Sequence, residues 1–273
     1  MEKAKQKEIS IITPTFNSEK YLQECLDSVR NQNGEFQLQH IIVDGSSKDN
    51  TMRILRDYSD SVDYEVKIIS GKDKNMYDAI NKGMKHVKGD IWACLNSDDM
   101  YLPNTLAIVV DFFKKNPEIE AAYGIYDAID SGGRFLYRRF LPRFRLKNLI
   151  DLKGSAIMPQ PTTFMRKRVI NKVGYFNINY NFASDYDYQI RMGSNCNVRR
   201  LKKVLTKFRK HSGTITSRES SQRKESDSIS EKYSKGRSII NRRIIGLIKL
   251  YLINMRIINI PFIFRKIIGK KGY

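Results

Sequence analysis

The first half of the chain alternates short apolar runs with stretches in which apolar residues recur at helical spacing. The apolar runs predict four strands, at 8–13, 38–43, 64–70 and 90–95, of which the second reads as buried. The stretches of helical spacing predict four helices, at 19–32, 50–58, 76–87 and 103–116. Strands separated by helices in this rhythm favour an α/β fold with a Rossmann-like, doubly wound and mostly parallel sheet.

The pattern changes after about residue 120. The β-like runs 121–129 and 134–140 flank a Gly-rich turn, which predicts an antiparallel hairpin. We expect a helix over 182–192 and a late strand over 204–211. Residues 212–230 are Ser-rich and polar, which is typical of a loop or linker.

The segment from 236 to 273 resumes helical spacing and is rich in Ile and Leu. Arg242, Lys249 and Arg256 repeat every seven residues and would form a narrow basic stripe on a helix, drifting about 20° per repeat. Charges interrupt the segment too often for a bilayer-spanning helix. The pattern therefore predicts a basic amphipathic helical tail that lies on an anionic membrane.

Charge is distributed unevenly along the chain. The net charge is +20, yet residues 1–196 are close to balanced, whereas 197–273 contain 21 basic and 4 acidic residues. A hydrophobic content of 41% excludes a disordered chain. The cysteines have no metal or redox spacing, and Cys25 and Cys94 sit among apolar neighbours, so we expect a reducing, cytoplasmic location. The polar opening MEKAKQKE does not resemble a secretion signal.

Polar residues follow three of the predicted strands, at the edge where open parallel sheets bind ligands. The fourth strand ends in Asp98 and Asp99, which should point in opposite directions on extended backbone. One carboxylate could accept hydrogen bonds from a ribose while the other binds Mg²⁺ or Mn²⁺. The alternative is a solvated turn or a helix N-cap before Pro103. No GxGxxG or P-loop sequence follows the first strand.

Longer motifs connect these features to a known family. They are ISIITPTFNSEKYLQECLDSV, IIVDGSSKDNT, GKDKNMYDAINKGMKHVKGDIWACLNSDDMY, QPTTFMRKRVINKVGYFN and FASDYDYQIRM. With them the chain resembles glycosyltransferase family 2 enzymes of the GT-A fold, a large bacterial polysaccharide-building group. The resemblance covers about residues 8–217, and its middle block is the most specific part.

The resemblance implies a nucleotide-sugar site. Its residues would be Pro14, Thr15 and Phe16 around the nucleobase, Asp44 at the base edge, Asp73, Tyr77 and Lys82 beside the nucleotide and diphosphate, and Asp98 at the ribose. Three of these have ordinary alternatives. Phe16 could pack in the core, Asp44 could cap the helix near residue 50, and Lys82 could be a solvated helix residue.

The resemblance also implies the catalytic and metal groups. Asp185 falls where the family places its base, which takes the acceptor hydroxyl's proton while the anomeric carbon is attacked and inverted. Asp99 would bind a divalent cation, Mn²⁺ or Mg²⁺, with His211 as a further candidate ligand unless it is simply exposed. Gln160 would lie on the acceptor side. Asp187 is expected to be structural.

Two departures from the family pattern bear on the site. Asp44 stands alone before its Gly where many relatives have two Asp residues, and Asn75 replaces a common Gly, which could alter a turn. Neither removes a catalytic group. A catalytically inactive relative kept as an assembly partner is disfavoured because Asp98, Asp99 and Asp185 are all present.

The leading hypothesis is an inverting, metal-dependent glycosyltransferase. It would move a sugar from a nucleotide sugar, UDP-linked, to a polyprenyl-diphosphate-linked oligosaccharide in lipopolysaccharide O-antigen or capsule synthesis, peripherally attached to the inner face of the plasma membrane. Residues 1–217 would form the catalytic domain, with a nucleotide-sugar half at about 8–120 and an acceptor half at 121–217. Residues 218–273 would form the linker and membrane-associating tail.

A second hypothesis is a basic nucleic-acid-binding protein, prompted by the net charge of +20. The excess charge sits in an Ile-rich tail, and the predicted catalytic half is nearly neutral. Membrane binding explains both the charge and the apolar residues, whereas nucleic acid explains only the charge. We therefore expect no nucleic-acid partner.

Overall fold

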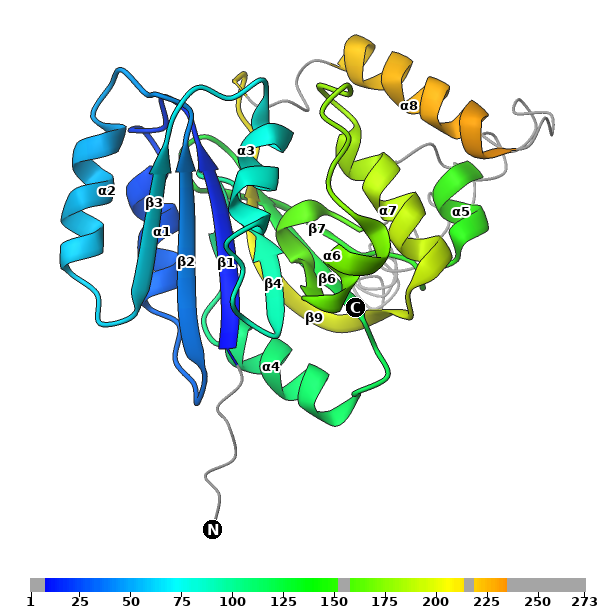
Figure 1. The fold of residues 1–273 in the computed structure, drawn as a ribbon, viewed down its shortest axis with the longest axis horizontal. Helices are drawn as coiled ribbons and strands as arrows, with labels where there is room; N and C mark the ends of the chain where they lie inside the picture. The colour runs from blue at the N-terminus through cyan, green and yellow to red at the C-terminus, as the bar shows by residue number, and fades with distance from the viewer. Residues whose placement is uncertain (1–7, 152–157, 214–218, 235–273) are drawn as a thin grey trace, which may run out of the picture.

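The structure is a computed structural model that describes residues 8–151, 158–213 and 219–234. Its strands are β1 (Glu8–Thr15), β2 (Gln37–Asp44), β3 (Glu65–Ser70), β4 (Ile91–Cys94), β5 (Met100–Tyr101), β6 (Ala121–Ile129), β7 (Phe135–Arg139), β8 (Thr163–Arg166) and β9 (Val198–Arg209). Its helices are α1 (Leu22–Arg30), α2 (Thr51–Asp60), α3 (Met76–Met84), α4 (Thr105–Lys115), α5 (Leu146–Asp151), α6 (Arg168–Val173), α7 (Ser184–Asn195) and α8 (Glu219–Ser234), with a 3₁₀ turn, η1, at Gln160–Thr162. Helices lie on both sides of one curled sheet (Figure 1).

The sheet runs in the order β3-β2-β1-β4-β8-β6-β9-β5, and β7 pairs with β6. The first four strands are parallel, so their carboxyl ends meet at one edge. Strand β8 is antiparallel to both β4 and β6, and β6 and β7 form the predicted hairpin. The α/β fold with a mostly parallel sheet is confirmed.

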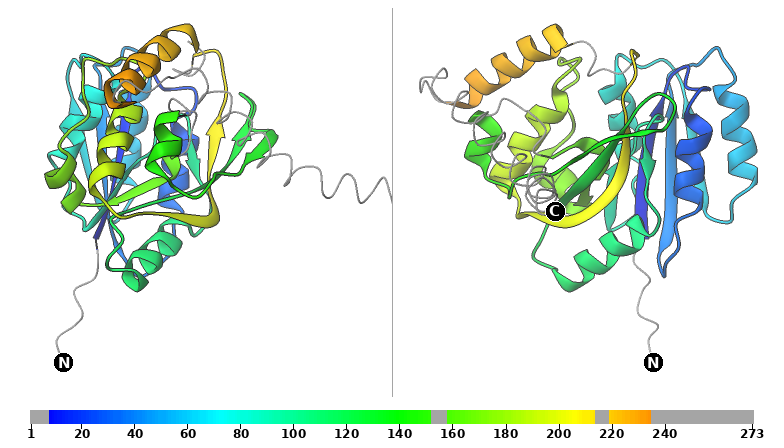
Figure 2. Two further views of the ribbon diagram at one scale, coloured as in Figure 1. Left: turned by 90° about the vertical axis from the view of Figure 1, so that its right-hand side faces the viewer. Right: turned by 180° about the vertical axis from the view of Figure 1, so that it is seen from behind.

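Two buried layers hold the helices to the sheet. Helices α1, α2 and α4 cover one face, where Cys25 and Leu106 lie in the core. Helices α3, α5, α6 and α7 cover the other face (Figure 2). Tyr77 and Met192 are buried in the core on that side. In α1, the buried side chains recur at the spacing that brings them to one helical face. The second layer carries the helices that matter for the site, α3 and α7.

The expected loop or linker over 212–230 is wrong over 219–230, because these residues belong to α8. The helix buries Ser226, Ile229 and Ser230 on one face. Serine is small enough to let this face approach its neighbours closely, but it carries little of the apolar signal that predicts an amphipathic helix. The proposed division of the chain at residue 217 stays a prediction, and the predicted membrane helix at 236–273 lies outside the described residues.

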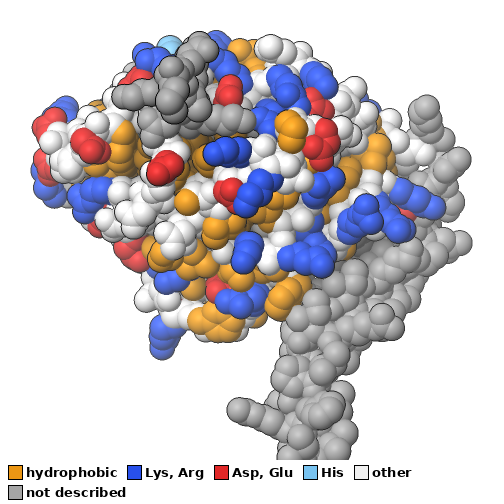
Figure 3. Space-filling view, turned by 90° about the horizontal axis from the view of Figure 1, so that it is seen from below, with side chains coloured by type: hydrophobic (Ala, Val, Ile, Leu, Met, Phe, Trp, Pro, Cys, Tyr) orange, Lys and Arg blue, Asp and Glu red, His pale blue; other side chains and the backbone are white. Residues whose placement is uncertain are grey.

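Within the part of the chain that the structure describes, no helix combines the length and apolarity needed to cross a bilayer. Seen from below, the surface carries Lys and Arg side chains interspersed with hydrophobic ones (Figure 3).

Candidate active site

Asp44 organises the loop that follows β2. Its side chain is buried, and its Oδ2 accepts hydrogen bonds from the backbone amides of Ser46 (3.0 Å) and Ser47 (3.1 Å) and from the Ser70 hydroxyl (3.1 Å). The left-handed φ of Ser46, 66°, bends the turn so that these amides face the carboxylate. The Thr15 hydroxyl donates to Oδ1 at 3.3 Å. The carboxylate thus fixes the rim between β1 and β2.

The alternatives for Phe16 and Asp44 are wrong. Phe16 is 65% exposed, so its ring is not part of the core and is accessible beside buried Pro14 and Thr15. The N-cap of α2 is Asn50, so Asp44 does not cap this helix. The end of β1 therefore presents a flat aromatic surface to solvent.

Asp98 and Asp99 lie in different environments. The Asp98 Oδ2 is 3.0 Å from the Nε2 of His211, and both side chains are partly exposed. Asp99 is only 1% exposed and accepts hydrogen bonds from the backbone amide of Arg209 (3.0 Å) and the side-chain amide of Asn96 (3.3 Å). Burial, together with the neighbouring charge of Asp98, holds the pKa of Asp99 well above its ordinary value. Of the two adjacent carboxylates, Asp98 is therefore partly exposed and Asp99 is buried. Neither caps α4, whose N-cap is Asn104.

Arg209 supports this loop from within the fold, and the sequence analysis missed it. Its guanidinium, 1% exposed, donates to the Asp98 carbonyl at 3.1 Å and to Glu24 at 2.8 Å, and it lies 4.5 Å from the ring centroid of Tyr21. His211 also packs on Tyr21, with 4.9 Å between ring centroids. In KFRK, nothing local distinguishes Arg209 from the basic residues beside it.

Lys82 is not a freely solvated helix residue. Its Nζ lies 2.5 Å from Asp73 Oδ1 and donates to the Lys72 carbonyl at 2.7 Å. The hydrogen bond with Asp73 raises the pKa of Lys82. The pair anchors the loop after β3 to α3, close to the rim that Asp44 shapes, since the Gly45 Cα faces Asp73.

Asn75 caps α3 and joins it to the loop before α7. It has an extended φ of −164°, which any residue adopts, so no glycine is needed here. Its side-chain oxygen accepts from the amide of Asp78 (3.1 Å). Its side-chain nitrogen donates to the Ile178 carbonyl (3.0 Å) and to Asn181 (2.9 Å). Asn75, which departs from the family pattern, therefore connects α3 to the loop before α7 through hydrogen bonds.

Asp185 lies in the first turn of α7 and faces α3. The hydroxyl of Tyr77 donates to its Oδ1 at 3.2 Å, and the buried Tyr77 ring stacks on Phe176 with 5.7 Å between centroids. Burial raises the pKa of Asp185, while hydrogen bonds from the Tyr77 hydroxyl and from backbone amides of the first turn oppose that rise. Such a carboxylate is held in place yet remains able to take a proton.

Gln160 reaches the loop after β4 from the other half of the chain. Its Nε2 donates to the Asn96 Oδ1 at 3.2 Å. Asp187 lies away from the rim, as expected: it is 2% exposed and paired with Arg191 at 2.8 Å. The structure therefore joins Gln160 through Asn96 to the Asp98–Asp99 loop and leaves Asp187 in a structural network.

A divalent cation can be tested against these groups. No cluster of three or more His, Cys, Asp or Glu side chains suited to a metal occurs among the described residues. Asp98 and His211 nevertheless place a carboxylate oxygen and an imidazole nitrogen 3.0 Å apart on partly exposed side chains. Mg²⁺ and Mn²⁺ commonly take one or two protein ligands and complete their shell with phosphate oxygens and water. The pair fits a cation that arrives with a diphosphate.

Comparisons with known proteins identify the family of the chain. The model of glycosyl transferase family 2 matches residues 10–174. A PGL/p-HBAD biosynthesis glycosyltransferase of Mycobacterium bovis is 31% identical over 188 residues, covering 68% of this chain and 70% of that protein. An uncharacterised glycosyltransferase of Rickettsia typhi is 26% identical over 227 residues, covering 81% of this chain and 70% of that protein.

Solved structures show the same fold. TarS 1–349 of S. aureus, in complex with UDP-GlcNAc, aligns with a TM-score of 0.62 and 22% identity over 77% of this chain and 61% of that chain. Mannosyltransferase PcManGT from Pyrobaculum calidifontis, in complex with GDP-Man and Mn²⁺, aligns with a TM-score of 0.55 and 17% identity over 75% of this chain and 57% of that chain. The chain thus spans about three fifths of the length of these solved chains, and the likeness establishes the GT-A architecture. Because the family model matches more than half of the chain and a relative above 30% identity covers two thirds of it, this protein belongs to glycosyltransferase family 2 and is a glycosyltransferase.

Proposed function

We propose that the protein transfers a sugar, with inversion, from a nucleoside-diphosphate sugar to an acceptor hydroxyl, and that Asp185 is the base. The observation that carries this proposal is the Asp185 carboxylate, held by the Tyr77 hydroxyl at 3.2 Å with its pKa raised by burial. A base works best when its pKa is closer to the working pH than that of a solvated aspartate. The anchored but protonatable Asp185 suits this task.

The transfer step follows from that role. Asp185 accepts the proton of the acceptor hydroxyl as the hydroxyl oxygen bonds to the anomeric carbon. The bond from that carbon to the diphosphate oxygen breaks with its electron pair leaving on the diphosphate, through an oxocarbenium-like transition state. Tyr77 keeps the carboxylate oriented while the proton moves.

Asp98 and His211, rather than Asp99, would hold the divalent cation. Asp98 and His211 face each other at 3.0 Å and are partly exposed, whereas Asp99 is buried and bonded to a backbone amide. When bound, the cation would supply positive charge to the departing diphosphate. The Mn²⁺ in the complex of PcManGT, a distant structural neighbour, supports the choice of ion.

The donor is proposed to be UDP-linked. The structure of the neighbour TarS contains UDP-GlcNAc, and that of PcManGT contains GDP-Man. TarS aligns with the higher TM-score, 0.62 against 0.55, which supports a uridine rather than a guanosine nucleotide. In this chain the exposed Phe16 ring offers a stacking surface for the base, and Lys82 of α3 pairs with Asp73 in the loop that would border the diphosphate.

The acceptor is proposed to be a lipid-linked glycan, polyprenyl-diphosphate-linked, used at the cytoplasmic face of the plasma membrane in cell-surface polysaccharide synthesis. The basic, Ile-rich segment after residue 235 supports attachment to anionic lipid. The relative named for PGL/p-HBAD biosynthesis supports a role in surface glycoconjugates.

The test measures nucleotide release from UDP- and GDP-sugars with Mn²⁺ and membrane-extracted acceptor. Asp185→Asn should lower transfer by about a hundredfold or more while donor binding, followed by thermal shift, is kept.

Asp98→Asn should lose Mn²⁺-dependent donor binding, and Asp99→Asn is its neighbouring control. Wild-type transfer in Asp185→Asn would refute the proposed base, and unchanged Mn²⁺ dependence in Asp98→Asn would refute the cation assignment.

A further inference from the structure

A carboxylate from α8 binds the chain just before α7. The Glu225 side chain accepts hydrogen bonds from three consecutive backbone amides, those of Asn181 (2.9 Å), Phe182 (2.8 Å) and Ala183 (2.9 Å). Ala183 is the N-cap of α7, and no side chain caps this helix locally. Glu225 thus supplies, from 42 to 44 residues further along the chain, the negative charge that a helix N-terminus favours.

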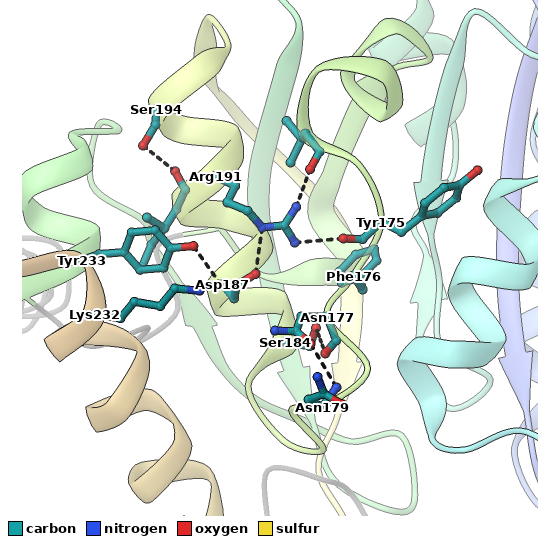
Figure 4. Close-up of polar contacts among 12 residues, drawn as sticks. Tyr175, Phe176, Asn177, Asn179, Ser184, Asp187, Arg191, Ser194, Lys232 and Tyr233 are labelled. Atoms are coloured by element: carbon teal, nitrogen blue, oxygen red, sulfur yellow. Dashed lines mark hydrogen bonds and ion pairs between the residues drawn. The ribbon is translucent and has the colours of Figure 1, made fainter.

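A second contact joins the end of α8 to the same turn of α7. The Tyr233 hydroxyl donates to Asp187 Oδ1 at 3.0 Å, and Asp187 Oδ2 accepts from Arg191 Nε at 2.8 Å (Figure 4). The Arg191 guanidinium also donates to the Tyr175 carbonyl at 2.9 Å. Asp187 is therefore the centre of a network that ties α7 to α8 on one side and to the chain after α6 on the other.

Packing holds α8 against the fold between these two contacts. Ile229 is fully buried in the cluster that contains α7, and Ser230 is 2% exposed. The Ser230 hydroxyl donates to the Ile150 carbonyl at 3.2 Å, and the Tyr186 hydroxyl donates to the same carbonyl at 3.2 Å. The end of α5 is thus shared by α7 and α8, so α8 is not a loosely attached terminal helix.

We propose that α8 is a positioning element for the catalytic base, with Glu225 and Tyr233 as its positioning residues. Asp185 lies between the two anchored positions, Ala183 and Asp187. Glu225 fixes the backbone that enters α7, and Tyr233 fixes the turn that follows the base. The inference rests on the proposed role of Asp185 and deepens it. Residues 219–234 lie outside the segment that the family model matches.

Glu225 also acts on Asp185 through its charge. Asp185 accepts a hydrogen bond from the Tyr77 hydroxyl of α3, and the Glu225 carboxylate of α8, which binds the amides just before α7, acts on Asp185 through its charge. The negative charge of Glu225 raises the pKa of Asp185, whereas the Tyr77 hydroxyl lowers it. Neutralising Glu225 should therefore move the acid limb of the pH–rate profile to lower pH. A purely structural helix would not give this signature.

The experiment compares Glu225→Ala, Glu225→Gln and Tyr233→Phe in the full chain, with Glu231→Ala on the exposed side of α8 as the matched control. We expect Glu225→Ala to lower kcat roughly ten- to a hundredfold with donor KM within twofold of wild type. Its acid limb should shift to lower pH. Glu225→Gln, which keeps one acceptor oxygen, should recover part of kcat but show the same direction of shift, and Tyr233→Phe should lower kcat alone.

Two results would overturn the proposal. Wild-type kcat and an unmoved acid limb in Glu225→Ala, whatever its melting temperature, would make α8 merely a stabilising helix. Equal effects in Glu231→Ala would show that the change is not specific to the anchored amides. If the alanine variant does not fold, Glu225→Gln is judged by the same two criteria. Loss of transfer in Asp185→Asn with no effect of Glu225→Ala refutes the positioning role alone, whereas full transfer in Asp185→Asn refutes the proposed base.

Discussion

At the scale of single residues, the same side chain behaves differently according to the donors that its neighbours supply. Asp44 is buried among amide and hydroxyl donors, Asp98 faces an imidazole at the surface, and Asp185 has one tyrosine hydroxyl and the start of a helix. The charge of a carboxylate is stabilised by hydrogen bonds and opposed by burial. The three aspartates therefore suit three different tasks.

The Tyr77–Asp185 hydrogen bond leads to a pH prediction. Because burial raises the pKa of Asp185, transfer should fall, as pH decreases, at a higher pH than an ordinary aspartate would give. The Tyr77 hydroxyl opposes this rise, so Tyr77→Phe should move the acid limb further up the pH scale, opposite to Glu225→Ala. The pH dependence of kcat/KM for both variants provides the measurement. An acid limb that moves down, or not at all, in Tyr77→Phe would contradict it.

At the scale of elements, apolar patterning predicted the strands and helices whose own sequence contains most of their buried apolar residues. The strands β1, β2 and β4 are nearly continuous apolar runs because both of their faces are covered. Helix α8 escaped notice because it buries serine, which is common in loops as well. Short elements such as β8 exist only through pairing with distant strands, so no local pattern marks them.

The candidate site divides in the same way. Asp98 and Asp99 stand out in the sequence because adjacent carboxylates directly after a buried strand require a reason, whereas Asp185 is indicated only by the resemblance to the family. Arg209 and Glu225 act through contacts 111 and 42 to 44 residues away in sequence, so they look like ordinary charged surface residues until the chain is folded. The local sequence could predict groups at strand ends but not their supports.

Burial of Ile229 predicts how strongly α8 is bound to the rest of the fold. Ile229→Ala should lower the free energy of unfolding by about 2–5 kcal/mol, because it removes buried methylene groups and leaves a cavity. The exposed Ser228→Ala is the matched control and should change stability little. Denaturant titration of both variants gives the comparison. Equal stability of the two variants would mean that α8 is not docked in solution.

At the scale of the whole molecule, the basic excess and the catalytic rim lie in different parts of the chain. The residues after 234 follow α8 directly in the sequence. No acidic residue follows Glu231, and nine of the eleven basic residues after it belong to 236–273. Attachment and catalysis should therefore be separable by a cut placed after α8 and not before it, since Tyr233 contacts Asp187.

Deleting residues 235–273 should release the enzyme from vesicles that contain anionic lipid, while transfer to a soluble acceptor is kept. The reason is that the deletion removes ten basic residues and the Ile-rich segment but leaves α8 in place. Co-sedimentation with anionic and neutral vesicles at low and high salt measures the effect. If the truncated protein still sedimented with anionic vesicles, the described domain itself would be the membrane-binding part.

The hydrogen bonds from the Asn181–Ala183 amides to Glu225 also constrain how such enzymes can be recombined. A chimera that joins the donor half of this chain to the acceptor half of a relative would have to exchange α7 and α8 together. A junction placed between residues 196 and 218 would leave the helix of the base facing a foreign partner in place of Glu225. Residues 181–195 and 219–234 should therefore be exchanged together, although the long strand β9 separates them in the sequence.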